Sequence, residues 1–555
     1  MNVLSATNRS QIISKLQSEV FDLVIIGGGI TGAGIALDAA SRGLKVALVE
    51  KDDFASGTSS RSTKLIHGGL RYLKQFEIML VREVGRERAI VHKLAPHLVT
   101  SEKMLLPLIK DGTFGKFMTS LGLMVYDVLA GVEKVDQRIM LSKEETIEKE
   151  PLLKEDIIEG GGLYAEYRTD DARLTIEIIK TAAKYGATSI NYVKATDFEY
   201  DDKGKVCGIK CEDIQDASSF SIRSKYVISA AGPWVDKLRK INNSLEGKHL
   251  FLSKGVHLVV PHERFPVNQS VYFDVSDGRM IFAIPRNRVT YIGTTDTPYS
   301  GDINHITTNQ EDANYLIDAV NNIFPGVHLK MEDVVSSWAG LRPLIFEEGK
   351  SASAISRKDE IFESENGLLS IAGGKLTGYR IMAEKIVDIV ARKILADQHL
   401  DLIDCFTDKI PLNGGPFSTP EEVQFYEKDL YQRIKGFNLD KHDAHYLVAN
   451  YGKQSDDIFE KFKELDEVHP RIRLARAELW YGVHHELVAD SMDFFARRTG
   501  RLYFEIQSIQ PVMDVVLNDL KNYLNWSDKK VEQEKVQLNQ AIYEAHNFES
   551  NKEQV

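Results

Sequence analysis

A glycine-rich turn between two apolar runs, in residues 21–50, restricts the fold of this chain more than any other stretch. The order is apolar strand, turn, small-residue helix, glycine stop, second apolar strand and terminal acid: FDLVIIGGGITGAGIALDAASRGLKVALVE. Gly27 and Gly29 let the backbone lie close to a pyrophosphate, and Gly32 lets the helix pack on the strand. Glu50 can accept hydrogen bonds from a ribose. The stretch predicts a Rossmann-like, dinucleotide-binding unit and leaves NAD and FAD equally open.

The length, composition and charge of the chain limit its number of domains and the kind of partner it can bind. With 555 residues, the chain is expected to form two to four domains. A hydrophobic content of 43% and a charged content of 27% are ordinary for a globular protein. The formal net charge of -12 argues against a nucleic-acid partner, because phosphate backbones favour a basic surface.

The cysteines and the apolar runs indicate a cytoplasmic protein. Cys207, Cys211 and Cys405 form no paired framework, which favours reduced thiols over disulfides or a metal site. No apolar run approaches the ~18 residues that a membrane span needs. Residues 1–20 lack the apolar core of a signal peptide and predict a short helix packed on the body. Peripheral attachment to a membrane remains open.

Two later stretches repeat the order strand, tight turn, helix. One has its turn at Gly232, and the other at Gly373 and Gly374. Turns of this kind meet at the carboxyl edge of an open α/β sheet, where ligands bind. A flavin must be held from several directions, so three such turns favour a flavin over NAD. The turn before Lys375 could aim helix amides and an ammonium at the flavin, although a plain helix cap would look the same.

The pattern along the chain predicts an α/β protein with an added α domain. Residues 251–297 alternate as an antiparallel sheet on the substrate side, and the chain beyond about 400 is almost wholly helical, with Thr419 as an N-cap. We expect a nucleotide-binding domain (about 21–100, 160–250 and 340–400) interleaved with a substrate domain (about 100–160 and 250–340). Residues 1–20 form an extension, and residues 401–555 form a helical domain.

Residues 104–131 are unusually apolar, MLLPLIKDGTFGKFMTSLGLMVYDVLAG. We interpret this stretch as a buried pair of helices. A second interpretation is an amphipathic surface that lies on a bilayer and admits a lipid-soluble partner.

Four basic residues come from separate segments and stand beside apolar, glycine or proline residues: Arg71, Arg342, Arg357 and Lys375. Any one of them alone is more often an ion-paired structural residue than a ligand clamp. Together they would form a pocket for a dianion such as a phosphate monoester. His257, on a strand, is either a base that removes a hydroxyl proton or a core histidine.

A set of motifs resembles one family. In order they are GGGITGAG, TSSRSTKLIHGGLRYL, AAGPWVDKL, GTTDT, AGLRPL, SRKDEIF and GGKLTGYR. The chain from about residue 22 to 382 is similar to the FAD-dependent sn-glycerol-3-phosphate dehydrogenases of the D-amino-acid-oxidase-like flavoprotein superfamily. The helical tail resembles the C-terminal domain of that family. Among these motifs KLIHGGLRYL and GGKLTGYR are the most diagnostic.

The resemblance implies roles for individual residues. Arg71 and Tyr72 would face the substrate, and His257 would lie near the reacting carbon. Arg342, Arg357 and Lys375 would hold the phosphate and polarise the hydroxyl, and the general base stays open between His257 and Lys375. The residues expected at FAD are Gly27, Gly29, Thr31, Gly32, Glu50, Ser59, Lys64, His67, Gly232, Gly373, Gly374 and Thr377.

The implied activity is oxidation of sn-glycerol 3-phosphate to dihydroxyacetone phosphate by hydride transfer to FAD. The family also implies a quinone acceptor and docking on the inner face of a membrane. A peroxide-forming glycerol-phosphate oxidase shares these motifs. Its branch of the family often carries an extra insertion, which is not evident in this sequence. A flavin amine oxidase and a flavin-bound scaffold that binds a partner through its helical tail also stay open. The sequence does not decide the oligomeric state, a homodimer included.

Overall fold

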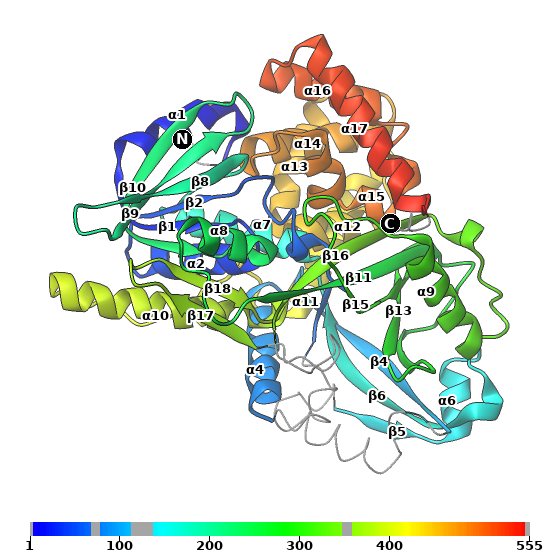
Figure 1. Ribbon diagram of the computed structural model, residues 1–555. Helices are drawn as coiled ribbons and strands as arrows, with labels where there is room; N and C mark the ends of the chain where they lie inside the picture. The colour runs from blue at the N-terminus through cyan, green and yellow to red at the C-terminus, as the bar shows by residue number, and fades with distance from the viewer. Residues whose placement is uncertain (1–3, 68–77, 111, 113–136, 347–357, 550–555) are drawn as a thin grey trace.

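The computed structural model describes residues 4–67, 78–110, 112, 137–346 and 358–549 (Figure 1). Within these residues the chain forms two sheets and a C-terminal group of helices. The sheets are built from interleaved segments of the first 375 residues. The C-terminal helices contact β16 (Ser336–Ile345) of the second sheet and helix α7 (Asp171–Lys184) of the first, and α16 (Met513–Leu524) lies at the top of the view in Figure 1.

The first sheet has a parallel centre. Its strands there are β10 (Ser219–Ser229), β1 (Val20–Ile26), β2 (Val46–Val49) and β7 (Thr188–Ile190). β18 (Leu369–Gly373) pairs parallel with β10, so two later segments return to the sheet that β1 begins, as predicted. Antiparallel strands complete it: β17 (Asp359–Glu363), β9 (Val206–Asp213) and β8 (Val193–Tyr200).

Small residues bring the helices of this sheet close together. α2 (Ile30–Ser41) packs against α7 (Asp171–Lys184) and α10 (Tyr379–Gln398). A Cβ at Gly34 would lie 2.8 Å from the Tyr379 ring, so glycine permits this approach. α7 begins after Asp170, whose side chain accepts a hydrogen bond from the Arg173 amide. The predicted N-terminal helix is α1 (Arg9–Ser18), which packs on β10 and β7.

The second sheet is mostly antiparallel and contains the strands predicted in residues 251–297. Its long strand β11 (Leu250–Pro261) pairs with β14 (Val289–Gly293) and β16 (Ser336–Ile345). The order continues through β13 (Met280–Arg286), β12 (Ser270–Asp274), β4 (Thr100–Ile109) and β6 (Ile158–Arg168). Its short strands are β3 (Leu65–Ile66), β5 (Ile139–Leu141) and β15 (Thr297–Pro298). The accompanying helices are α4 (Ile78–Leu94), α6 (Lys143–Lys149) and α9 (Gln310–Ile323).

One helix prediction is wrong, and the domain division remains a proposal. Two of its boundaries, expected at about 160 and 340, lie near strands β6 and β16 of the second sheet. Residues 104–109, expected in a helix, lie in β4, because a short run of buried apolar residues fits a strand and a helix equally well. Residues 111 and 113–131 of that apolar stretch lie outside the described residues.

The C-terminal region is helical, as predicted. Its longer helices are α11 (Pro420–Ile434), α12 (Lys441–Tyr451), α13 (Ser455–Glu464), α14 (Pro470–His485), α16 (Met513–Leu524) and α17 (Asp528–His546). The Thr419 side chain accepts a hydrogen bond from the Glu422 amide and caps α11. A buried ion pair between Arg173 of α7 and Glu486 joins this region to the first sheet. In the described parts of the chain, no helix combines the length and apolarity needed to cross a membrane.

Candidate functional site

The three predicted turns meet at one edge of the first sheet. β1, β10 and β18 are neighbours, with Ile26 paired to Ser229 and Ser229 paired to Ser370. Each strand ends in its glycine turn, followed by α2, by η5 (Gly232–Trp234) with α8 (Val235–Ile241), or by η7 (Leu376–Gly378) with α10. The turns line one cavity of about 470 Å³, which confirms the prediction that they converge.

The first turn can be made only with glycine. Gly27 has φ +114°, and a Cβ there would lie 2.6 Å from the Ala230 carbonyl oxygen. A Cβ at Gly32 would lie 1.9 Å from the Gly27 carbonyl oxygen, so this glycine lets α2 pack on the turn. Ser59 Oγ accepts a hydrogen bond from the Ile30 amide at 2.9 Å and ties the loop after β2 to the start of α2.

Glu50 closes one end of the cavity. Its carboxylate accepts hydrogen bonds from the Gly28 amide at 2.7 Å and the Asp52 amide at 3.0 Å. Burial raises the pKa of Glu50 to about 7, against these two amides, which favour the charged form. An acid at the end of β2 is where a ribose contact was predicted.

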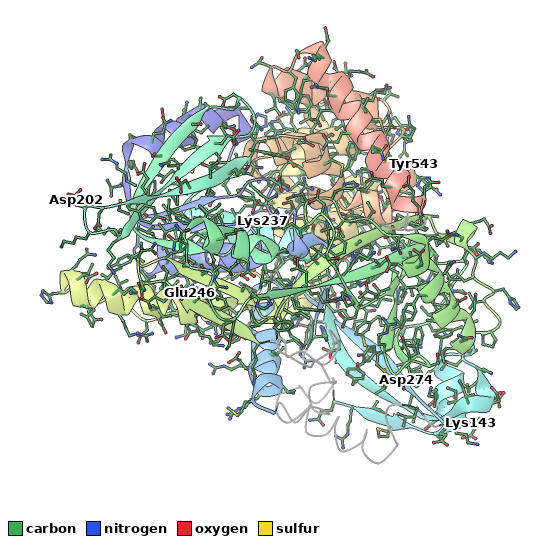
Figure 2. All side chains as sticks on the ribbon, viewed as in Figure 1. Lys143, Asp202, Lys237, Glu246, Asp274 and Tyr543 are labelled. Atoms are coloured by element: carbon green, nitrogen blue, oxygen red, sulfur yellow. The ribbon has the colours of Figure 1, made fainter. Side chains whose placement is uncertain are left out.

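Side chains that the sequence did not single out complete this end. Val193, Lys194 and Ala195, at the start of β8, line the cavity beside Glu50, whose carbonyl oxygen accepts a hydrogen bond from the Val193 amide at 2.8 Å. Trp234 and Lys237 line it from η5 and α8. Figure 2 labels Lys237, which lies on α8, near the centre of the view. The signal for Trp234 was the small-residue turn AAGPW, but the β8 residues have no motif.

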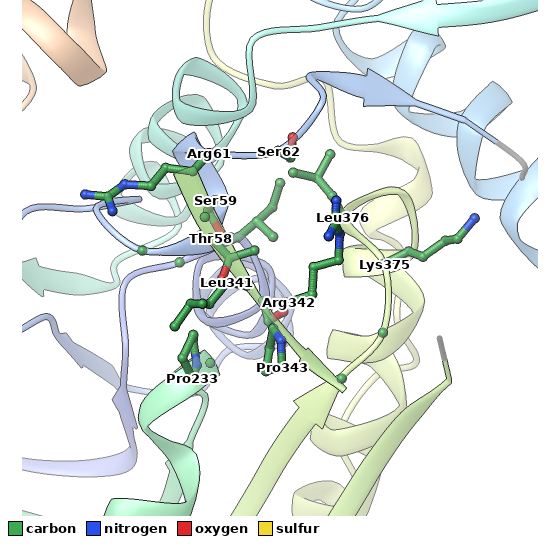
Figure 3. Close-up of a pocket in the computed structure, with 18 of the residues that line it drawn as sticks. Thr58, Ser59, Arg61, Ser62, Pro233, Leu341, Arg342, Pro343, Lys375 and Leu376 are labelled. Atoms are coloured by element: carbon green, nitrogen blue, oxygen red, sulfur yellow. Dashed lines mark hydrogen bonds between the residues drawn. The ribbon is translucent and has the colours of Figure 1, made fainter. Parts of the chain in front are cut away.

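The other end of the cavity carries cations, an imidazole and aromatic rings. Arg342 comes from β16 and Lys375 from the turn after β18 (Figure 3). His67 lines the same end, where the stacked rings of Tyr272 and Phe282, 4.2 Å apart, form part of the wall. The cations at this end can bind an anionic group, and the aromatic rings can pack against the carbon atoms of the same molecule.

The segment after β14 holds the guanidinium of Arg342. Arg342 donates to Thr294 Oγ1 at 2.8 Å and to the Thr295 carbonyl oxygen at 3.1 Å, and lies 3.4 Å from Asp296. A Cβ at Gly255 would come within 2.4 Å of the guanidinium, so glycine on β11 makes room for it. These contacts fix the side chain before a ligand arrives, which reduces the entropy lost on binding.

His67 is a neutral imidazole at neutral pH. Burial lowers its pKa well below the ordinary value, and the charges of Lys375 and Arg88 lower it further. Its edge contacts the Phe282 ring, with centroids 6.0 Å apart. A neutral imidazole on a cavity wall can accept a proton from a bound molecule.

Three of the predicted site residues lie behind the cavity wall. Gly32 lets α2 pack on the first glycine turn and does not line the cavity. Lys64 is buried and donates to Asp171 at 2.5 Å and to the Ser60 carbonyl oxygen at 3.1 Å. Burial alone would lower the pKa of Lys64, but Asp170 and Asp171 raise it, so it stays charged. His257 is buried on β11 and does not line the cavity, but its ring lies within hydrogen-bonding distance of Thr63, which does.

The remaining predictions divide between the cavity and the residues that the structure does not describe. The predicted residues that line the cavity are Gly27, Gly29, Thr31, Glu50, Ser59, His67, Gly232, Arg342, Gly373, Gly374, Lys375 and Thr377. Arg71, Tyr72 and Arg357 lie outside the described residues.

The sequence matches two protein families along its length. It matches the FAD dependent oxidoreductase family over residues 22–380. It matches the C-terminal domain of alpha-glycerophosphate oxidase over residues 405–531. The aerobic glycerol-3-phosphate dehydrogenase of Staphylococcus haemolyticus is 50% identical over 544 residues, 98% of each chain.

This chain belongs to the FAD-dependent oxidoreductase family. The aerobic glycerol-3-phosphate dehydrogenase of Bacillus subtilis is 48% identical over 544 residues, again 98% of each chain. A crystal structure of the glycerol-3-phosphate dehydrogenase from Bacillus halodurans, complexed with FAD, superposes with a TM-score of 0.84. That protein is 42% identical, and the match covers 98% of each chain.

The cofactor of this flavoprotein family is FAD, and the cavity fits it. Gly27 and Gly29 line the cavity at the start of α2, where the helix N-terminus favours the negative charge of a pyrophosphate. Glu50 and the β8 residues would hold the adenosine half, and the Gly373–Gly374 turn with Lys375 would hold the flavin half. Among the described residues, no cluster of His, Cys, Asp or Glu could hold a metal ion.

Proposed function

We propose that this protein oxidises sn-glycerol 3-phosphate to dihydroxyacetone phosphate, with FAD as the hydride acceptor. The observation that carries the proposal is that Arg342, Lys375 and a neutral His67 share the flavin end of one cavity. Two cations suit a phosphate dianion better than the single carboxylate of an amino acid. The names of relatives that match almost the whole chain support the same substrate.

The side chains of the site would bind and orient the substrate. Arg342 and Lys375 are proposed to hold the phosphate, so that binding energy at this group fixes the position of C2. Arg71, Tyr72 and Arg357 are proposed to contribute to the same pocket on the resemblance alone. FAD, when bound, supplies the acceptor for the hydride from C2. The proton of the C2 hydroxyl must pass to a protein base.

Anaerobic titration tests the function. The purified protein should show a flavin spectrum that bleaches on addition of glycerol 3-phosphate without oxygen. Recovery with a quinone analogue and slow recovery with oxygen support a dehydrogenase, whereas rapid peroxide formation selects an oxidase. A colourless protein, or a flavin that bleaches with an amine and not with glycerol 3-phosphate, contradicts the proposal.

We also propose that a membrane quinone reoxidises the flavin, with the protein attached peripherally to the cytoplasmic face of the membrane. The proposal is supported by the word aerobic in the names of the relatives, which are dehydrogenases rather than oxidases. Flotation with lipid vesicles and quinone reduction in those vesicles test it. Sedimentation analysis of the same sample decides between a monomer and the homodimer that the sequence left open.

A further inference from the structure

The imidazole of His257 is fixed between strands and does not line the cavity. His257 is 1% exposed. Its ring stacks on Trp338 of β16, with centroids 4.8 Å apart and planes 12° apart. On the other side, a Cβ at Gly293 would lie 2.1 Å from the ring. Because packing at this density does not allow the ring to swing out, His257 reaches a bound molecule only through another group.

That group is the hydroxyl of Thr63. Thr63 Oγ1 lies 3.0 Å from His257 Nε2, and Thr63 also lines the cavity. Among the described residues, Nδ1 of His257 has no hydrogen-bond partner, so the contact with Thr63 is the polar link of the ring.

The backbone around Thr63 is anchored on both sides. Tyr291 donates its hydroxyl to the Thr63 carbonyl oxygen at 3.1 Å, and the indole of Trp338 donates to the Ser62 carbonyl oxygen at 3.1 Å. Trp338 thus both stacks on His257 and positions the segment that carries Thr63. The hydroxyl is held at hydrogen-bonding distance from the imidazole by rigid strands rather than by a loose loop.

Charges around the pair keep the imidazole neutral in the resting site. Burial lowers the pKa of His257 well below its ordinary value, and the nearby charges of Arg342 and Lys64 lower it further. Lys64 is itself paired with Asp171. A dianion bound at Arg342 would offset the cationic field there, so the imidazole gains proton affinity when the substrate is present.

We propose that Thr63 relays the hydroxyl proton of the substrate to His257. This inference rests on the proposed function. As the O–H bond of the C2 hydroxyl breaks, its proton goes to Thr63 Oγ, and the proton of Thr63 goes to His257 Nε2. The C2–H bond breaks with its electron pair, which leaves as hydride to FAD, and C2 and its oxygen form the carbonyl. The substrate loses two electrons and FAD gains two.

Rapid-mixing reduction of the FAD-loaded enzyme by glycerol 3-phosphate tests the relay. Thr63→Val keeps the shape of the side chain and removes the hydroxyl, and we expect flavin reduction to slow by about 100-fold or more. The FAD content and the substrate concentration for half-maximal rate should change little, because Thr63 binds neither the cofactor nor the phosphate in this scheme. Thr63→Ser should restore the rate to within about threefold of the wild type.

A double mutant separates a relay from two independent roles. If Thr63 and His257 act in one proton path, the variant carrying both Thr63→Val and His257→Asn is no slower than the slower single variant. Losses that multiply contradict the proposal. Reduction of the Thr63→Val enzyme at the wild-type rate also contradicts the proposal, whatever the reduction rate of a His67→Asn variant. If the wild-type flavin does not bleach at all, the proposed function fails rather than the relay.

A spectroscopic readout does not depend on turnover. In protein labelled with nitrogen-15 histidine, the Nε2 resonance of His257, assigned with His257→Asn, should report a hydrogen bond in the wild type and in Thr63→Ser. The same resonance should move toward a free nitrogen in Thr63→Val. An unchanged resonance overturns the link on which the relay depends.

Discussion

At the scale of single residues, Glu50 couples the cofactor cavity to pH. Its pKa in the folded protein is about 7, above the ordinary value of 4.5. Between these pH values the folded protein keeps a proton that the unfolded chain has released. The contribution of Glu50 to the free energy of unfolding therefore falls as pH rises from about 4.5 to 7, by up to about 3 kcal/mol.

Glu50→Gln removes this dependence on pH. The FAD-free wild type should lose more stability between pH 5 and pH 8 than the variant, as measured by urea unfolding. Glu532→Gln, at an exposed position of α17, is the matched control and should follow the wild type. Identical pH profiles for the wild type and Glu50→Gln would show that the carboxyl is not held in its neutral form.

Arg342 separates substrate binding from cofactor binding. In the proposed site its guanidinium, which donates to Thr294 and Thr295, holds the phosphate of the substrate rather than FAD. Arg342→Ala should raise the concentration of glycerol 3-phosphate for half-maximal reduction by about 10-fold to 100-fold, because hydrogen bonds between charged groups are lost. Reduction should also slow, and the flavin content should stay unchanged.

The control for Arg342 is Arg433→Ala, which removes a guanidinium paired with Asp456 near the surface of α11. It should behave as the wild type in the reduction assay. Loss of flavin from Arg342→Ala would place this residue at the cofactor instead.

At the scale of elements, the turn between β18 and α10 depends on left-handed backbone. Gly373 has φ +78°, and a Cβ there would lie 2.6 Å from the Lys358 carbonyl oxygen. Gly186, after α7, has φ +99° and open space around the same position. A residue with a Cβ would strain the backbone at both glycines. At Gly373, unlike at Gly186, it would also clash with a carbonyl oxygen, and Gly373 lines the cavity.

Gly373→Ala should therefore lower both stability and flavin content, and Gly186→Ala only stability. The strain common to both is about 1–2 kcal/mol, and the clash at Gly373 adds to it. The ratio of flavin to protein after purification and the thermal midpoint measure the two effects. Equal flavin content in both variants would mean that the turn does not hold the cofactor.

At the scale of the whole molecule, Asp53 joins the cofactor loop to the C-terminal helices. It accepts two hydrogen bonds from Arg498, at 2.7 and 2.9 Å, and one from Arg497 at 2.5 Å. Asn191, beside the β8 residues of the cavity, donates to it at 2.9 Å. Burial alone would raise the pKa of Asp53, but Arg498 and Arg497 hold it at about 2. The C-terminal region thus fixes two segments that line the cavity.

Asp53→Asn leaves two buried guanidiniums short of a partner. We expect a loss of about 3–5 kcal/mol in the free energy of unfolding and a weaker hold on FAD, measured by urea unfolding and by release of flavin fluorescence. Asp456→Asn breaks an exposed pair with Arg433 and should cost less than about 1 kcal/mol. A tight FAD complex in Asp53→Asn would limit the role of the C-terminal helices to stability.

The sequence by itself determined the features that depend on neighbours along the chain. Glycines at defined spacing are directly informative because only glycine fits the turns at Gly27 and Gly373. The order strand, turn, helix predicted α2 and α10, and the Thr419 cap predicted the start of α11. The motifs around these turns were enough to indicate the flavoprotein family.

Only the tertiary structure decided which side chains share the cavity. Lys64 and His257 stand in motifs that resemble the site of the family, yet both lie behind the wall, held by Asp171 and Trp338. His257 and Thr63 are 194 positions apart, and their contact exists because β11 and the segment beside β3 pack together. Such contacts depend on how distant segments fill one interior, so no local pattern at either residue reports them.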